Sequence, residues 1–167
     1  MNTKKLFAGM IACTALISAL VVPASAANNT DTNFTCTIAS GIRYANTETA
    51  QRLKQDSSSS YINYSTRVNG TAASGPYQFE AIIYGADSYY STFVDCSSFT
   101  NSGKPRSKAI VTRGSKGLVR QDVYEKFGSG AYGQIWGTKA PSGTTGTAKG
   151  CWSVDSVGSY PYYNYVL

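Results

Sequence analysis

Histidine is absent from the 167 residues. This absence excludes the Ser-His-Asp and Cys-His arrangements of nucleophilic catalysis, and no Ser-x-x-Lys motif follows residue 26. Charged residues make up only 14% of the chain, which rules out disorder driven by high charge. The four cysteines are scattered and do not form a zinc-ligand cluster. We therefore expect no catalytic residue, no metal site and no cofactor.

The N-terminus has the pattern of an export signal. Lys4-Lys5 precedes an apolar run over 6–22, and a small-x-small cleavage site ends at Ala26. A retained membrane anchor is the alternative, but the run is barely long enough to span a bilayer. We expect a signal peptide over 1–26 that is removed, and a single secreted, extracellular domain over 27–167.

Three cysteines would remain after export, namely Cys36, Cys96 and Cys151. An oxidising compartment allows them one disulfide and leaves one spare thiol, which offers a route to a dimer. All three pairings are open. We favour Cys36 with Cys151, because the first and last strands of a sandwich often lie side by side.

Alternation of apolar and polar residues dominates the chain from Phe34 onward, which is the signature of β-strands. One segment, 118–127, instead repeats its apolar residues every four positions and predicts a short helix. Together these patterns predict an all-β fold, a single antiparallel β-sandwich of about six to eight short strands with at most one helix. A small β-barrel is the alternative. The predicted strands cover 34–38, 61–68, 77–84, 89–94, 109–112, 131–139 and 145–153.

Three short motifs carry a resemblance to a known group of proteins. They are Ala27-Asn28-Asn29-Thr30-Asp31-Thr32-Asn33-Phe34, Lys54-Gln55-Asp56, and Gly150-Cys151-Trp152-Ser153-Val154-Asp155-Ser156. In these motifs the chain resembles small secreted proteins of Gram-positive bacteria with no assigned activity, some encoded near lactococcin-like bacteriocin genes. Cys151 departs from that pattern. The resemblance implies a secreted, bacteriocin-like protein, and it implies no catalytic residues.

Basic residues are concentrated in one part of the chain. Between Cys96 and Gln121 there are six of them and no acid, a local excess that favours a polyanionic partner. We expect an anionic cell-wall polymer or membrane surface as the partner, whereas nucleic acid is disfavoured because no groove-reading module is visible. Alternation along strands could also spread these residues over several faces. The candidate binding residues are Lys104, Arg106, Lys108, Arg113, Lys116 and Arg120.

Aromatic residues near the C-terminus suggest a second mode of binding, because sugar rings stack on flat aromatic faces. This alternative is a carbohydrate-binding module for a glycan. Its candidate platform consists of Trp152, Tyr160, Tyr162 and Tyr163.

A glycosidase is the remote enzymatic alternative, since such an enzyme needs only two carboxylates. Glu80 lies on a predicted strand, and Asp122 and Glu125 lie on the predicted helix. The first hypothesis remains a non-enzymatic β-sandwich that acts at the cell envelope and binds an anionic surface through the basic stretch.

Overall fold

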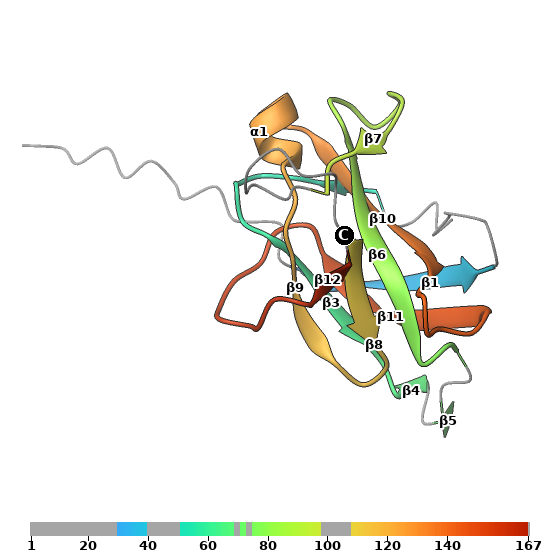
Figure 1. Cartoon of the computed structure of the whole chain (residues 1–167). Helices are drawn as coiled ribbons and strands as arrows, with labels where there is room; N and C mark the ends of the chain where they lie inside the picture. Colours follow the sequence, from blue (N-terminus) through green and yellow to red (C-terminus); the bar gives the residue numbers. More distant parts are fainter. Residues whose placement is uncertain (1–29, 40–50, 69–70, 73–74, 98–107, 167) are drawn as a thin grey trace, which may run out of the picture.

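The computed structural model describes residues 30–39, 51–68, 71–72, 75–97 and 108–166. The predicted signal peptide, Lys104 and Arg106 lie outside these residues. Within them, two antiparallel sheets face each other and do not close into a barrel, which confirms the predicted β-sandwich (Figure 1). No helix in this part of the chain reaches the length and apolar character that a bilayer crossing demands.

The first sheet, sheet A, has four strands in the order β1-β11-β3-β9. Along β1 the side chains alternate between the core and solvent, so Phe34, Cys36 and Ile38 point inward while the residues between them are exposed. Because β1 pairs with β11, the first strand lies beside the last long strand of the chain. The bounds are β1 Thr32–Ile38, β3 Ser60–Tyr64, β9 Lys116–Val119 and β11 Gly146–Ser153.

The second sheet, sheet B, has the order β12-β8-β6-β10-β2, and β7 adds a short pairing to β6. The ribbon β4-β5 lies apart at one end of the molecule, and α1 lies with β7 at the opposite end (Figure 1). We call these the hairpin end and the helix end. The bounds are β2 Arg52–Leu53, β4 Arg67–Val68, β5 Thr71–Ala72, β6 Gln78–Ala86, β7 Val94–Asp95, β8 Lys108–Thr112, α1 Val123–Phe127, β10 Tyr132–Lys139 and β12 Tyr165–Val166.

Aromatic rings fill the space between the sheets. The ring centroid of Phe79 on sheet B lies 6.2 Å from that of Phe34 and 5.2 Å from that of Tyr64, both on sheet A. At Gly137 the sheets approach so closely that a Cβ there would lie 2.8 Å from Cδ1 of Ile38. Burial of these side chains stabilises the fold by about 25 cal/mol per Å² of apolar surface removed from water.

Two predicted segments differ from the structure. Leu118 and Val119 belong to β9 and pair with β3, and the helix begins only at Val123. The repeat every four residues thus spans a strand and a helix, because a pairing partner decides the backbone of so short a segment. Over 89–94, only Val94 joins a strand, while Tyr89 and Tyr90 are exposed beyond the end of β6.

The expected disulfide between Cys36 and Cys151 is wrong, because all three described cysteines are free thiols. The two strands that carry Cys36 and Cys151 do lie side by side. However, Cys36 pairs with Ala148 and is fully buried in the core, whereas Cys151 pairs with Asn33 on the outer face. Side chains on opposite faces of a sheet cannot be bridged without moving the backbone.

Thiol labelling of a chain that comprises residues 27–167 tests this arrangement. At neutral pH we expect a thiol reagent to modify only Cys151 in the folded state, and slowly, because burial raises the pKa of Cys151 to about 11. All three thiols should react after unfolding in urea without reductant. The Cys151→Ser variant should lose the labelling of the folded state. Fewer than three reactive thiols after unfolding would show that a disulfide exists.

Candidate functional site

A fully buried ion pair lies at the helix end of the sandwich. Nζ of Lys54 lies 2.6 Å from Oδ1 of Asp155, and both side chains have 0% exposure. Nζ also donates to the carbonyl oxygens of Ser58 and Val154, the latter at 3.0 Å. The three acceptors satisfy the three N–H groups of a lysine ammonium. Oδ2 of Asp155 accepts a hydrogen bond of 3.1 Å from the backbone N–H of Gln55.

The ion pair joins segments of both sheets. Lys54 directly follows β2 of sheet B, and its N–H donates to Ala131 O at 2.7 Å. Asp155 follows β11 of sheet A, whose extension at Val154 accepts a hydrogen bond from Ser60 Oγ of β3. The ion pair of Lys54 and Asp155, with its hydrogen bonds, therefore fastens β2, an edge strand of sheet B, to β3 and β11 of sheet A. We call this ion pair and its hydrogen bonds the clasp.

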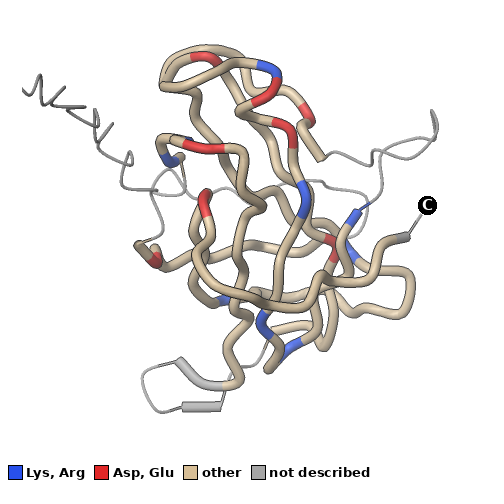
Figure 2. Tube along the Cα trace, turned by 90° about the vertical axis from the view of Figure 1, so that its left-hand side faces the viewer, with Lys and Arg blue, Asp and Glu red and all other residues tan. Residues whose placement is uncertain are grey.

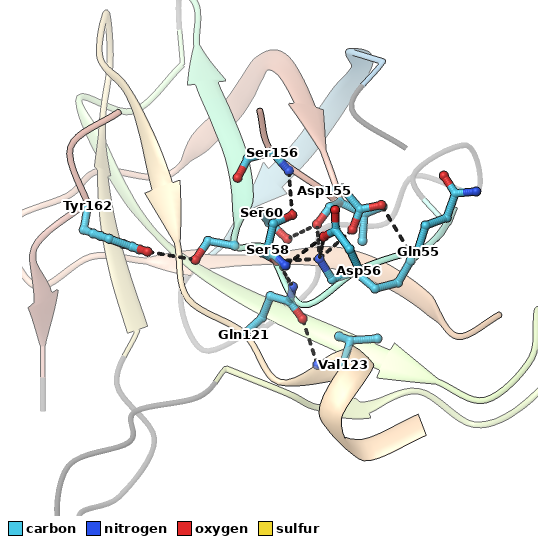
Figure 3. Close-up of polar contacts among 12 residues, drawn as sticks. Gln55, Asp56, Ser58, Ser60, Gln121, Val123, Asp155, Ser156 and Tyr162 are labelled. Carbon is cyan, nitrogen blue, oxygen red and sulfur yellow. Dashed lines mark hydrogen bonds and ion pairs between the residues drawn. The ribbon is translucent and has the colours of Figure 1, made fainter. Parts of the chain in front are cut away.

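Polar side chains extend this clasp to the helix (Figure 3). Nε2 of Gln121 donates to Ser58 O at 2.7 Å, and Oε1 of the same amide accepts from the N–H of Val123 at 2.7 Å. Ser58 Oγ in turn accepts from the N–H of Ser156 at 2.9 Å. Gln121 thus connects the start of α1 to the loop that covers the ion pair.

A second carboxylate lies beside the pair. Oδ1 of Asp56 is 3.7 Å from Nζ of Lys54 and accepts a hydrogen bond from the N–H of Ser58 at 2.8 Å. Burial works to raise the pKa of Asp56, but hydrogen bonds from Ser58 and the charge of Lys54 outweigh it and lower that pKa. The side chain of Asp56 is 40% exposed, so it also reaches solvent.

The C-terminal segment connects the two sheets along their open side. Pro161 O accepts from the N–H of Leu118 at 2.9 Å, and the N–H of Tyr163 donates back to Leu118 O at 3.0 Å. Two residues later, Tyr165 pairs with Ala109 of β8. We call residues 157–166 the C-terminal strap, because they run from the edge of sheet A to the edge of sheet B.

The strap brings part of the basic stretch against part of the aromatic cluster. Nζ of Lys116 lies 5.7 Å from the ring centroid of Tyr160, and the guanidinium of Arg120 lies 4.5 Å from that of Tyr162. These are cation–π contacts, worth about 0.5–1 kcal/mol each at exposed sites. Residues that we expected to form separate binding surfaces therefore belong to one surface along β9.

The aromatic platform does not assemble as expected. Trp152 has 0% exposure, because it points from β11 into the core, and Tyr163 of the strap is also buried against the core. Neither ring can contact a glycan at the surface. Tyr162 is 46% exposed, and Tyr160 packs at 4.7 Å against the ring of Tyr61.

The four described residues of the basic stretch do not lie on one face. Lys108 points outward from sheet B, where it forms an ion pair of 2.7 Å with Glu80. Lys116 points outward from sheet A. Arg113 lies at the hairpin end, where it donates to Gly75 O at 3.0 Å. Arg120 follows the opposite end of β9 and contacts the strap.

The topology adds two lysines to the hairpin end that the local sequence pattern did not indicate. Lys139 ends β10 beside Phe79, while the N–H of Arg113 donates to Tyr77 O on the other side of β6. On sheet A, Lys149 and Lys116 flank the end of β3 in the same way. Lys116, Lys139 and Lys149 are all exposed. We call Arg113, Lys116, Lys139 and Lys149 the basic end.

Acidic residues gather mainly at the opposite end of the sandwich (Figure 2). Asp122 and Glu125 belong to α1 or its N-cap, and Asp87 and Asp95 lie near β7. Among the carboxylates considered for a glycosidase, Glu80 is thus held by Lys108 on sheet B, and Asp122 is paired with Lys126 at 3.0 Å. These two carboxylates lie on different elements. Most carboxylates of the described residues lie toward the helix end, whereas Arg113, Lys116, Lys139 and Lys149 lie at the hairpin end (Figure 2).

Comparison with known proteins places the chain in a family. By its fold, the protein is a small β-sandwich of two sheets with a buried ion pair at one end. A family model described as a protein of unknown function (DUF2712) matches residues 22–156, and the chain belongs to this family. The match includes the buried ion pair and ends where the C-terminal strap begins. Neither the curated proteins nor the solved structures contain a match.

Removal of one partner of the buried ion pair should destabilise the fold strongly. Lys54→Met leaves the Asp155 carboxylate buried without its counter-ion, which should lower the free energy of unfolding by about 3–5 kcal/mol. The matched control is Lys126→Met, which breaks a half-exposed ion pair worth less than about 1 kcal/mol. Urea unfolding measures both. Equal losses in the two variants would contradict a structural role for the clasp.

One buried hydroxyl anchors the strap in addition to its backbone hydrogen bonds. Tyr163 Oη donates to Ile62 O at 3.0 Å, and burial raises the pKa of this tyrosine to about 12. Tyr163→Phe removes the hydrogen bond and should lower the free energy of unfolding by about 1 kcal/mol. Tyr162→Phe is the control, since its hydroxyl is exposed and should matter little. Equal thermal unfolding temperatures of the two variants would show that the Tyr163 hydrogen bond does not hold the strap.

Proposed function

We propose that this protein is an exported, non-enzymatic β-sandwich that binds an anionic polymer of the bacterial cell wall through its basic end. The observation that carries the proposal is the separation of charge along the molecule, with Arg113, Lys116, Lys139 and Lys149 at one end and the acids mainly at the other. A polyanion approaching this dipolar molecule meets attraction at one end and repulsion at the other.

The form of the basic end suits a polymer better than a small ligand. Its lysines are exposed and come from both sheets, so they present separated charges at the surface. A phosphate-rich polymer such as wall teichoic acid repeats its charge along its length and can contact several of them at once. Several weak contacts on one polymer then add up to useful affinity.

The aromatic surface favours the same partner. A sugar that stacks on tyrosine needs a free ring face, but Lys116 covers Tyr160 and Arg120 covers Tyr162. The fully buried Trp152 contributes nothing to such a surface. Charge is therefore the better supported basis of recognition. Antagonism of neighbouring cells, the bacteriocin-like role that the resemblance implies, would follow from this attachment to the wall.

Binding to purified cell walls tests the proposal. Lys139→Gln with Lys149→Gln should weaken cosedimentation with walls about two- to fivefold per removed charge, as expected for exposed charge contacts. Binding of the unaltered protein should also fall as salt rises, because salt screens exposed charges. Walls stripped of teichoic acid and vesicles of anionic lipid complete the set of targets.

The control variant is Lys126→Gln, which removes one positive charge at the helix end and is compared with the loss per removed charge at the basic end; it should leave wall binding unchanged. An equal loss in the control, or binding that ignores salt, would overturn the proposal. Binding to anionic vesicles without binding to walls would also overturn it, in favour of a membrane surface.

A further inference from the structure

The buried clasp places an amine in contact with a carboxyl group where water is excluded. Nζ of Lys54 and Oδ1 of Asp155 lie 2.6 Å apart, with both side chains at 0% exposure, and the carboxylate of Asp56 lies 3.7 Å from the same nitrogen. We propose that Lys54 and Asp155 condense after folding into an intramolecular isopeptide bond, an amide between Nζ of Lys54 and Cγ of Asp155.

The reaction balances without any co-reactant. The step begins with transfer of one proton across the 2.6 Å contact from the ammonium to the carboxylate, which yields an amine and a carboxylic acid. The uncharged amine is a nucleophile. It attacks Cγ of Asp155, a C–N bond forms, and one C–O bond breaks. The hydroxyl leaves with one proton from the nitrogen as a single water molecule.

Asp56 has the position of a proton carrier for this step. Its lowered pKa keeps it a carboxylate, and its Oδ1 lies 3.7 Å from Nζ, so it can accept a proton from the nitrogen and pass it to the departing hydroxyl. Because 40% of its side chain is exposed, it also marks a route by which water leaves.

The surrounding backbone holds the two reacting groups in place. Carbonyl oxygens of Ser58 and Val154 fix the nitrogen, and the N–H of Gln55 fixes Oδ2 of Asp155. This fixed contact supplies the proximity that makes an intramolecular reaction fast. The bond would link residues 101 positions apart, and like a disulfide it would restrict the unfolded chain. It would do so in a protein whose described cysteines are all free.

The intact mass of the purified, exported protein tests the bond directly, once its N-terminal residue is known. We expect a mass lower than that of the sequence by one water molecule, and a protease digest that contains one branched peptide with both Lys54 and Asp155. Lys54→Arg keeps the positive charge but offers no primary amine, so it should show the full mass. Asp56→Asn should fold with an unchanged circular dichroism spectrum and form the bond at least tenfold more slowly during refolding.

A full mass for the folded wild-type protein would overturn the proposal. So would a loss of water that persists in Lys54→Arg, because a cyclised aspartate elsewhere would then account for it. If Lys54→Arg does not fold, the wild-type mass and the branched peptide decide the question by themselves. This test does not measure wall binding, so its outcome is independent of the proposed function.

Discussion

The contact between Lys54 and Asp155 is the constraint on which the arrangement of this sandwich depends. Two charges removed from water are costly unless their geometry and hydrogen bonds are excellent. Here every N–H of the ammonium has an acceptor, and the carboxylate accepts from both the ammonium and Gln55. Because the acceptors come from separate segments, the pair is satisfied only when β2, β3 and β11 are all in place.

The two ends of the molecule differ in their polar and charged side chains. At the helix end, buried polar groups hold the sheets together, and Gln121 extends the network into α1. At the hairpin end, basic side chains of Lys116, Lys139 and Lys149 reach into solvent from the ends of strands. The fold thus buries an ion pair at one end and exposes basic side chains at the other.

Much of the fold could be predicted from local pattern. Alternation located β1, β6, β10 and β11 to within a few residues, although only β1 has one buried and one exposed face along its whole length, while β6 and β10 are buried on both faces over most of theirs. It failed over 118–127, where pairing with β3 overrides the helical spacing, and over 89–94, where aromatic residues have no partner strand. Alternation also could not exclude the disulfide, since the relative faces of Cys36 and Cys151 depend on register.

The candidate sites were harder to predict because they depend on contacts distant in sequence. Lys54 lies in the most polar stretch of the chain, where burial is least expected, and its partner is 101 residues away. The one available signal was that Lys54-Gln55-Asp56 and the segment ending in Asp155-Ser156 both belong to the motifs of the resemblance. Lys139 and Lys149 lie outside the basic stretch, and only the strand topology brings them to the end that carries Arg113.

Hydrogen exchange at two backbone amides tests the central role of the clasp most directly. The N–H of Gln55 donates to Asp155, and the N–H of Ser156 donates to Ser58, although both lie in loops outside the strands. If the clasp holds the sandwich together, these amides should exchange only through global unfolding, as slowly as the amides of β6 and β10. Exchange as fast as that of exposed loop amides would show that the clasp opens while the sheets stay intact, and would contradict this account.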